Sequence, residues 1–161
     1  MKNMIYVVLV FFLFQVGASR SYAETAVETL SPELRSLLQQ EMSAIENGMK
    51  DIISAYVSGD LKTIAEIANQ LESSFILKQK LTAQQRSELH DKLPKQFIDK
   101  DKQSHRIARS LERFSIDGNV ELVGVYYAKL LESCVSCHSE FAAHRFPSLI
   151  NSSTNKEDYY Y

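Results

Sequence analysis

The chain has few residues that break helices and few cysteines. Its 161 residues include five glycines, three prolines, no tryptophan and two cysteines. With so few breakers, with apolar residues recurring every three or four positions, and with no convincing alternation, the sequence predicts helices throughout and argues against strands. A structural zinc site normally takes four ligands, and the chain lacks the second cysteine pair that would supply them.

The first 23 residues have the layout of a secretory signal peptide. Lys2 supplies a positive start, residues 5–14 form an apolar run, and Ser21-Tyr22-Ala23 places small residues where a signal peptidase cuts. The run is shorter than the roughly 20 residues that a membrane-spanning helix needs. We therefore expect cleavage before Glu24 and a periplasmic location, with no stable membrane span afterwards. An uncleaved anchor is the alternative, and it too leaves the rest of the chain outside the cytoplasm.

The remaining 138 residues fit one domain, which we expect over residues 24–146, followed by a polar, flexible tail over residues 147–161. The leader contains Lys2 and Arg20 and no acidic residue. The 18 basic residues of the chain therefore fall to 16 against 20 acidic ones, a formal charge of −4. This balance argues against nucleic acid as a partner, and no cluster of Lys and Arg stands out in the sequence.

Four amphipathic helices and one short connecting helix begin and end at residues that favour helix boundaries. The first helix starts at Ser31-Pro32-Glu33 and stops at Ser58-Gly59, and the second starts at Asp60 and ends near Leu77. The short connecting helix starts at Thr82 and is ended by Pro94. The third helix covers about 95–114, and the fourth runs from Asn119 to about Ala143. Four long helices joined by short loops predict an all-α, antiparallel four-helix bundle.

The fourth helix carries both cysteines in the sequence Ser-Cys-Val-Ser-Cys-His-Ser-Glu-Phe, residues 133–141. Residues three apart are neighbours on a helix, so Cys134 and Cys137 present two thiols on one side, spaced to meet the two vinyl groups of a porphyrin edge. His138, one residue on, would direct its imidazole toward the iron. This C-x-x-C-H pattern is typical of c-type haem attachment. The inward stripe of the helix is expected to comprise Val123, Tyr127, Leu130, Cys134, Cys137, His138 and Phe141.

Other interpretations of the cysteine pair are a disulfide, a redox dithiol and chance. A disulfide between Cys134 and Cys137 is awkward inside a continuous helix and would close too small a loop to add much stability. A thioredoxin-like pair would be expected near a βαβ pattern, and the sequence shows none. Chance juxtaposition stays open, although export and the lack of any other cysteine both favour haem.

The chain resembles the cytochrome c-prime family, the class II c-type cytochromes, over roughly residues 34–145. The resemblance lies in the leader, four helices, the Gly59-Asp60 turn and Cys-Val-Ser-Cys-His-Ser-Glu-Phe late in the last helix. It implies a four-helix bundle holding one covalent haem c, with thioethers at Cys134 and Cys137 and His138 as the proximal ligand. Members often pair through their first two helices, so the resemblance also carries the expectation of a homodimer.

Family members differ in what covers the distal face of the iron. In one kind an apolar side chain of the first helix leaves a five-coordinate site for small gases such as nitric oxide; in the low-spin kind a methionine of that helix binds the iron. The stretch from Leu38 to Met49 is similar to the low-spin members, which implies Met42 as the distal ligand. The sequence places Met42 and Met49 on the core face, where both could instead fill space.

The other histidines are expected at surface or capping positions. His105 of the third helix is the best outside candidate for an iron ligand, whereas His90 lies in the connector and His144 in the last turn of the fourth helix. One departure from the family is Ala142, where many members carry a basic residue near the porphyrin; Arg145 is the substitute one turn later. The connector over residues 78–94 is also longer than the resemblance implies.

The sequence thus predicts a periplasmic monohaem c-type cytochrome that transfers single electrons to and from redox partner proteins. We do not expect an enzyme, because no paired carboxylates, nucleophile constellation or nucleotide-binding loop is visible. Binding of small gases at a five-coordinate iron is the alternative function, and a haem-free helical interaction protein is a remote third.

Overall fold

The computed structural model describes residues 26–151, and all regular structure in this range is helical. The leader over residues 1–23 and the end of the tail lie outside the described residues. None of the helices in this range is long and apolar enough to cross a membrane. In chain order the elements are η1 (Val27–Thr29), α3 (Pro32–Ser58), α4 (Leu61–Ser73), α5 (Leu77–Lys80), α6 (Ala83–Lys92), α7 (Lys95–Ile116), α8 (Val120–Phe141) and α9 (Ser148–Asn151).

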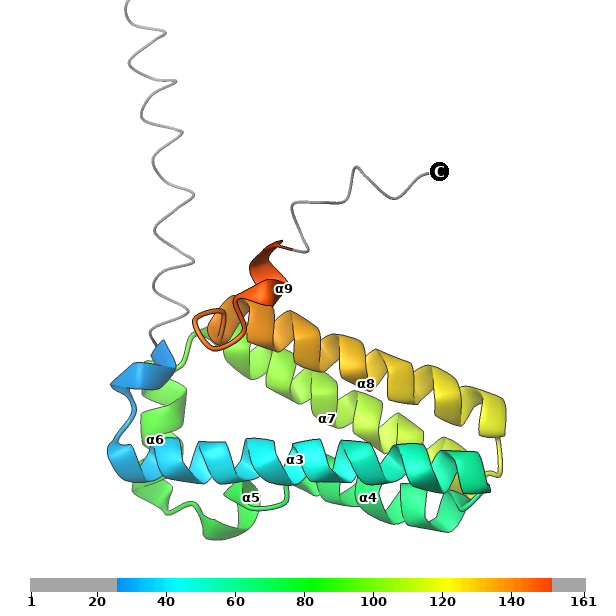
Figure 1. Ribbon diagram of the computed structural model, residues 1–161. Helices are drawn as coiled ribbons and strands as arrows, with labels where there is room; N and C mark the ends of the chain where they lie inside the picture. Colours follow the sequence, from blue (N-terminus) through cyan, green and yellow to red (C-terminus); the bar gives the residue numbers. More distant parts are fainter. Residues whose placement is uncertain (1–25, 152–161) are drawn as a thin grey trace, which may run out of the picture.

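The four long helices pack in a bundle-like arrangement, which confirms the predicted all-α class (Figure 1). Helix α7 lies at the centre of the contacts, against α4 on one side and α8 on the other, and α3 packs mainly on α4. Figure 1 shows that α3 and α8 are close where α3 ends and α8 begins, and that they diverge toward the end of α8 that carries the cysteines.

The core consists of the inward faces of these four helices. Its main cluster contains Met49, Ile52, Ala55, Ile64, Ala68, Leu71, Ala108, Leu111, Val123 and Leu130. A second, smaller cluster holds η1 and the start of α3 against the end of α6; it contains Ala26, Leu30, Leu34 and Leu93. The connector is therefore part of the packed structure, with an apolar cluster of its own.

Most predicted boundaries are confirmed. Gly59 ends α3 with φ of 75°, which a residue without Cβ adopts at little cost, and the carboxylate of Asp60 accepts the Thr63 N–H at the start of α4. Thr82 and Gln85 form the predicted capping box of α6. Ser31 does occupy the N-cap of α3, but its hydroxyl donates to Glu88 instead of capping the helix.

One predicted helix end is wrong. Helix α4 stops at Ser73, four residues before Leu77, because the chain turns at Ser74, whose φ is 61°, and the next three N–H groups bind the carboxylate of Glu41. Helices α7 and α8 end at Ile116 and Phe141, each within two residues of the predicted position. Within the segment predicted as a tail, residues 148–151 form the short helix α9, which contacts α8.

Candidate functional site

The stripe predicted on the last helix does face the bundle. Val123, Leu130 and Phe141 are at most 3% exposed, and the Phe141 ring packs edge-on against Phe97 of α7 with centroids 5.2 Å apart. The Tyr127 hydroxyl donates to the Met49 carbonyl of α3 over 3.0 Å. Because Cys134 follows Tyr127 by seven residues, two helical turns, the cysteine lies on the side of α8 that faces α3.

Cys134 and Cys137 are half-buried, unpaired thiols within the continuous helix α8. Burial raises the pKa of Cys134 and raises that of Cys137 to about 11, although Lys100 nearby opposes the second shift. Both thiols are therefore protonated near neutral pH. A redox-active dithiol needs a lowered pKa, so these surroundings argue against a thioredoxin-like role.

His138 is half-buried beside the cysteines, and its ring stacks on Phe146 with centroids 4.4 Å apart and planes 5° from parallel. Burial, and next the positive charge of Arg145, lower the pKa of His138. The imidazole is therefore neutral at pH 7, which is the form that binds metals. No ring nitrogen of His138 is hydrogen-bonded within the described part of the chain. Arg145, the predicted substitute for a basic residue at Ala142, thus lies close enough to act on His138 electrostatically.

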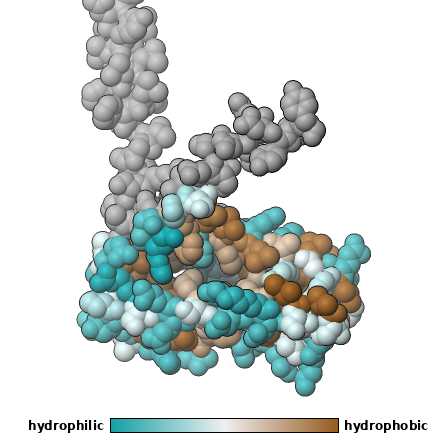
Figure 2. Space-filling view, in the orientation of Figure 1, coloured by the Kyte–Doolittle hydropathy of each residue, from teal (hydrophilic) through white to brown (hydrophobic). Residues whose placement is uncertain are grey.

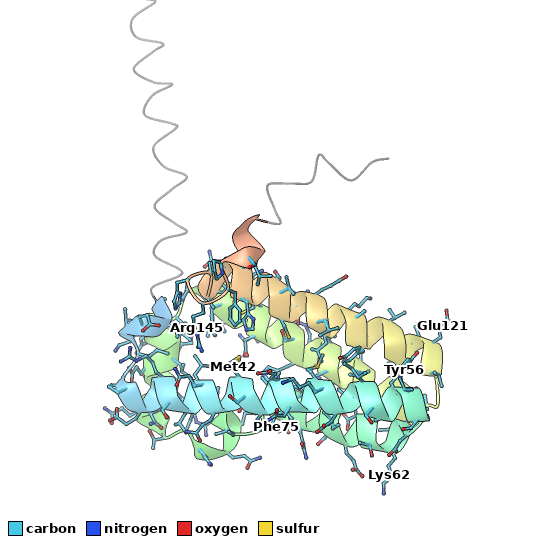
Figure 3. All side chains as sticks on the ribbon, in the orientation of Figure 1. Met42, Tyr56, Lys62, Phe75, Glu121 and Arg145 are labelled. Carbon is cyan, nitrogen blue, oxygen red and sulfur yellow. The ribbon has the colours of Figure 1, made fainter. Side chains whose placement is uncertain are left out.

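The two methionines of α3 have different surroundings. Met49 is 6% exposed in the main core cluster, as predicted. Met42 lies on the same face of α3, seven residues earlier, but it is 40% exposed and is not a packed core residue. The cause is the divergence of α3 from α8, which leaves Met42 without a facing helix; Figure 3 shows it projecting from α3 toward the side of α7 and α8, with Arg145 above it in this view.

The surface between α3 and the cysteine-bearing end of α8 is hollowed, and hydrophobic residues form part of the rim (Figure 2). Cys134 and His138 belong to α8, and Met42 belongs to α3. The thiols and the imidazole therefore lie on one helix and the thioether on another, with Cys134 on the side of α8 that faces α3. This arrangement suits a flat, largely apolar group attached to α8.

The remaining histidines do not join this set. Nδ1 of His105 lies 2.9 Å from the Leu71 carbonyl and Nε2 lies 3.5 Å from Asp101, so the ring is bound toward α4. The hydrogen bond with Asp101 is the main cause that raises the pKa of His105, against the effect of burial. His90 is exposed on α6 beside Asp91, and His144 lies 3.7 Å from Glu28.

Two features near the site were not foreseen from the sequence. Glu41 is 3% exposed, and its carboxylate accepts three backbone N–H bonds, from Phe75, Ile76 and Leu77. The spacing of seven from Leu34 to Glu41 and from Glu41 to Gly48 places the glutamate on the buried face and could have indicated this role. The stacking of Phe146 on His138 follows a turn after α8 and had no comparable indication.

Within the described range, no three His, Cys, Asp or Glu side chains converge as a metal site made by the protein alone. A haem iron does not need such a cluster, because the porphyrin occupies four coordination positions and leaves one or two for side chains. No protein family, no curated protein and no solved structure matches this chain.

Proposed function

We propose that this protein is a periplasmic monohaem c-type cytochrome that transfers single electrons, an antiparallel four-helix bundle similar to the low-spin members of the cytochrome c-prime family. One observation carries the proposal: Cys134, Cys137 and His138 lie within about one turn of α8 and are half-buried, as two unpaired protonated thiols and one neutral imidazole. This is the set of groups that covalent haem attachment requires.

The residues fit the group in chemistry as well as in spacing. The thiols of Cys134 and Cys137 would hold the porphyrin edge as thioethers, and His138 would hold the iron from the same turn of helix. Bound haem supplies an iron that takes up and releases one electron. The protein would contribute the imidazole of His138, whose ring lies parallel to that of Phe146.

Met42 is the proposed distal ligand. Its side chain projects from α3 toward the side of α8, and at 40% exposure it is not committed to the core, unlike Met49 at 6%. A thioether opposite a histidine raises the reduction potential, as suits an electron carrier. His105 is the weaker candidate, because its two ring nitrogens already face Leu71 and Asp101.

The attachment is tested by producing the full chain in a periplasm that has a c-type haem maturation system. We expect a covalent haem that survives denaturation and acid extraction, and a haemochrome spectrum of the type with two thioether bonds. C134S and C137S should each shift that spectrum toward a single thioether, and the double variant should lose covalent haem. Ser136→Ala, between the two cysteines, is the matched control and should keep it.

The absence of covalent haem in the wild-type chain would overturn the proposal. A reduced protein with a high-spin spectrum that binds carbon monoxide readily would keep the haem site but replace electron transfer by the binding of small gases such as nitric oxide. A six-coordinate low-spin spectrum in both oxidation states supports electron transfer.

A further inference from the structure

Helix α7 concentrates positive charge in a protein that is acidic overall. It contains six Lys and Arg residues and three Asp and Glu residues, a formal charge of +3. The whole chain has a formal charge of −2, so the residues outside α7 sum to −5. The basic residues of α7 are separated along the sequence and interleaved with acids, which is why no cluster stood out there. Helical periodicity gathers them.

Three of these cations are exposed and form no ion pair with any residue of the described range: Lys102, Arg106 and Arg113. At 100° per residue they lie within about 40° of one another around the helix and span about 16 Å along it. The other basic residues of α7 are engaged. Lys95 pairs with Asp99, Arg109 with Glu72, and Lys100 with Glu140. We call Lys102, Arg106 and Arg113 the cationic stripe.

The cationic stripe begins level with the cysteine-bearing part of α8 but on the outer face of α7, because Lys102 lies about 160° around the helix from Lys100. Lys100 donates to Ser136 over 2.6 Å, and the Ser104 hydroxyl lies 3.1 Å from that of Ser133, so this half of α7 packs against residues 133–140. A partner bound over Lys102 is therefore separated from α8 by the width of α7, about 10–12 Å. A groove runs along the contact between α7 and α8, and its lining includes Gln103 and Ile107 of α7 and Tyr126 of α8. Gln103 lies about 60° around α7 from Arg106, so the groove borders the stripe.

We propose that the cationic stripe and the groove beside it form the docking surface for an acidic patch on a partner protein, and, resting on the proposed function, that electrons pass to or from the haem across this surface. Unpaired cations gain more from an incoming carboxylate than paired ones, because no existing ion pair has to be broken. Such charge steers encounter and orients the partner.

A protein surface fits better than a membrane or a nucleic acid. Asp99, Asp101 and Glu112 lie on the same helix as the stripe, and the rest of the chain is negative, so a flat anionic bilayer or a rigid duplex would be repelled over most of its contact area, whereas a flexible or locally acidic carboxylate surface can follow the stripe alone. The groove contains Ile107 and the Tyr126 ring, so it also offers apolar contact to side chains that protrude from a partner protein.

The first test measures binding without using the haem. Full chain is passed over immobilised poly-L-glutamate, and the variant K102Q/R106Q/R113Q is compared with K50Q/K62Q/K80Q, which removes the same charge from exposed positions outside α7. We expect the wild type and the control to be retained and the stripe variant to elute roughly tenfold weaker. Equal retention of the two variants, or no retention of the wild type, would overturn the proposal that the stripe is a docking surface. Stripe-dependent binding that is tighter to phosphatidylglycerol vesicles or to duplex DNA would overturn the assignment to a protein.

The second test uses the haem-loaded protein and the oxidation rate by ferricyanide, a small trianion. The negative charge of the whole molecule predicts that the rate rises with added salt, whereas local attraction at the stripe predicts that it falls. We expect a fall for the wild type and the control, and about a tenfold lower rate at low salt for the stripe variant. An oxidation rate that rises with salt, or that is the same in the wild type and the stripe variant, would overturn the role of this surface in electron transfer. If the chain carries no haem, the proposed function is wrong, but the poly-L-glutamate test still shows whether the stripe binds carboxylates.

Discussion

The Oε2 atom of Glu41 lies 2.6 Å from the backbone nitrogen of Ile76, 35 residues away along the chain. The same carboxylate binds the N–H groups of Phe75 and Leu77, so one buried side chain of α3 satisfies the backbone where α4 has ended and α5 begins. A buried carboxylate is tolerated because it is hydrogen-bonded. Glu41 immediately precedes Met42, and so this contact also holds the segment that carries the proposed distal ligand.

Replacing Glu41 by alanine should cost about 3 kcal/mol of unfolding free energy, because three partly buried N–H groups lose their acceptor at once. Urea unfolding followed by circular dichroism measures the loss. Glu46→Ala, an exposed position on α3 paired only with Lys50, is the control and should leave stability almost unchanged. Equal effects of the two substitutions would mean that the Glu41 bonds do not hold the connector.

Adding one carbon at Gly124 should destabilise the protein despite alanine's better helix propensity. A Cβ there would lie 2.7 Å from the Tyr56 hydroxyl, which donates to the Val120 carbonyl over 3.2 Å. The clash and the lost bond together should cost about 1–3 kcal/mol, against roughly 0.5–1 kcal/mol gained from replacing glycine in a helix. Figure 3 shows Tyr56 near the end of α3, where α8 comes close.

The double variant G124A/Y56F distinguishes this cause from a general intolerance of alanine at position 124. Without the hydroxyl, the nearest ring carbon lies 3.3 Å from the added Cβ. Gly124→Ala should therefore be nearly neutral in the Tyr56→Phe background, as a double-mutant cycle of urea midpoints would report. An unchanged penalty would place the clash elsewhere.

The pair formed by His105 and Asp101 should stabilise the fold more at low pH than at high pH. The raised pKa of His105 means that the folded protein favours the protonated ring. That contribution is fully present below the unfolded pKa of about 6.5 and is lost as the pH rises through the higher folded value. Asp101→Asn should thus reduce the unfolding free energy more at pH 5.5 than at pH 8.5. Asp51→Asn, exposed on α3, should show no such difference; a pH-independent effect of Asp101→Asn would contradict the assignment.

Substitutions of Met42 and Met49 should distinguish binding of the iron from packing in the core. In the haem-free chain, Met49→Ala should cost about 2–5 kcal/mol because Met49 is buried, while Met42→Ala should cost less than about 1 kcal/mol. In the haem-loaded protein, Met42→Ala should convert a low-spin spectrum to a high-spin one, and Met49→Leu should not. A low-spin spectrum retained in Met42→Ala but lost in His105→Ala would move the ligand to α7.

Much of the fold was predictable from local sequence. Pro32, Gly59, Asp60, Thr82 and Pro94 act on their own backbone or on a neighbour within a few residues, so their effects on helix ends are visible without a tertiary structure. The end of α4 was not predictable in this way, because the acceptor that turns the chain at Phe75 is Glu41, far away in sequence. The apolar residues up to Leu77 continued the helical pattern and concealed the turn.

The candidate site likewise has features that local sequence predicts and features that depend on the packing of distant segments. The sequence alone determined that Cys134, Cys137 and His138 share one side of one helix, since a helix places residues three and four apart together. Only the tertiary structure decided which way that side faces, that Met49 is core while Met42 is exposed, and that the cations of α7 are left unpaired on one face. These three features depend on how α3 diverges from α8 and on which charged partners the neighbouring helices supply. They could not be predicted, because a short stretch of sequence does not show how distant segments pack.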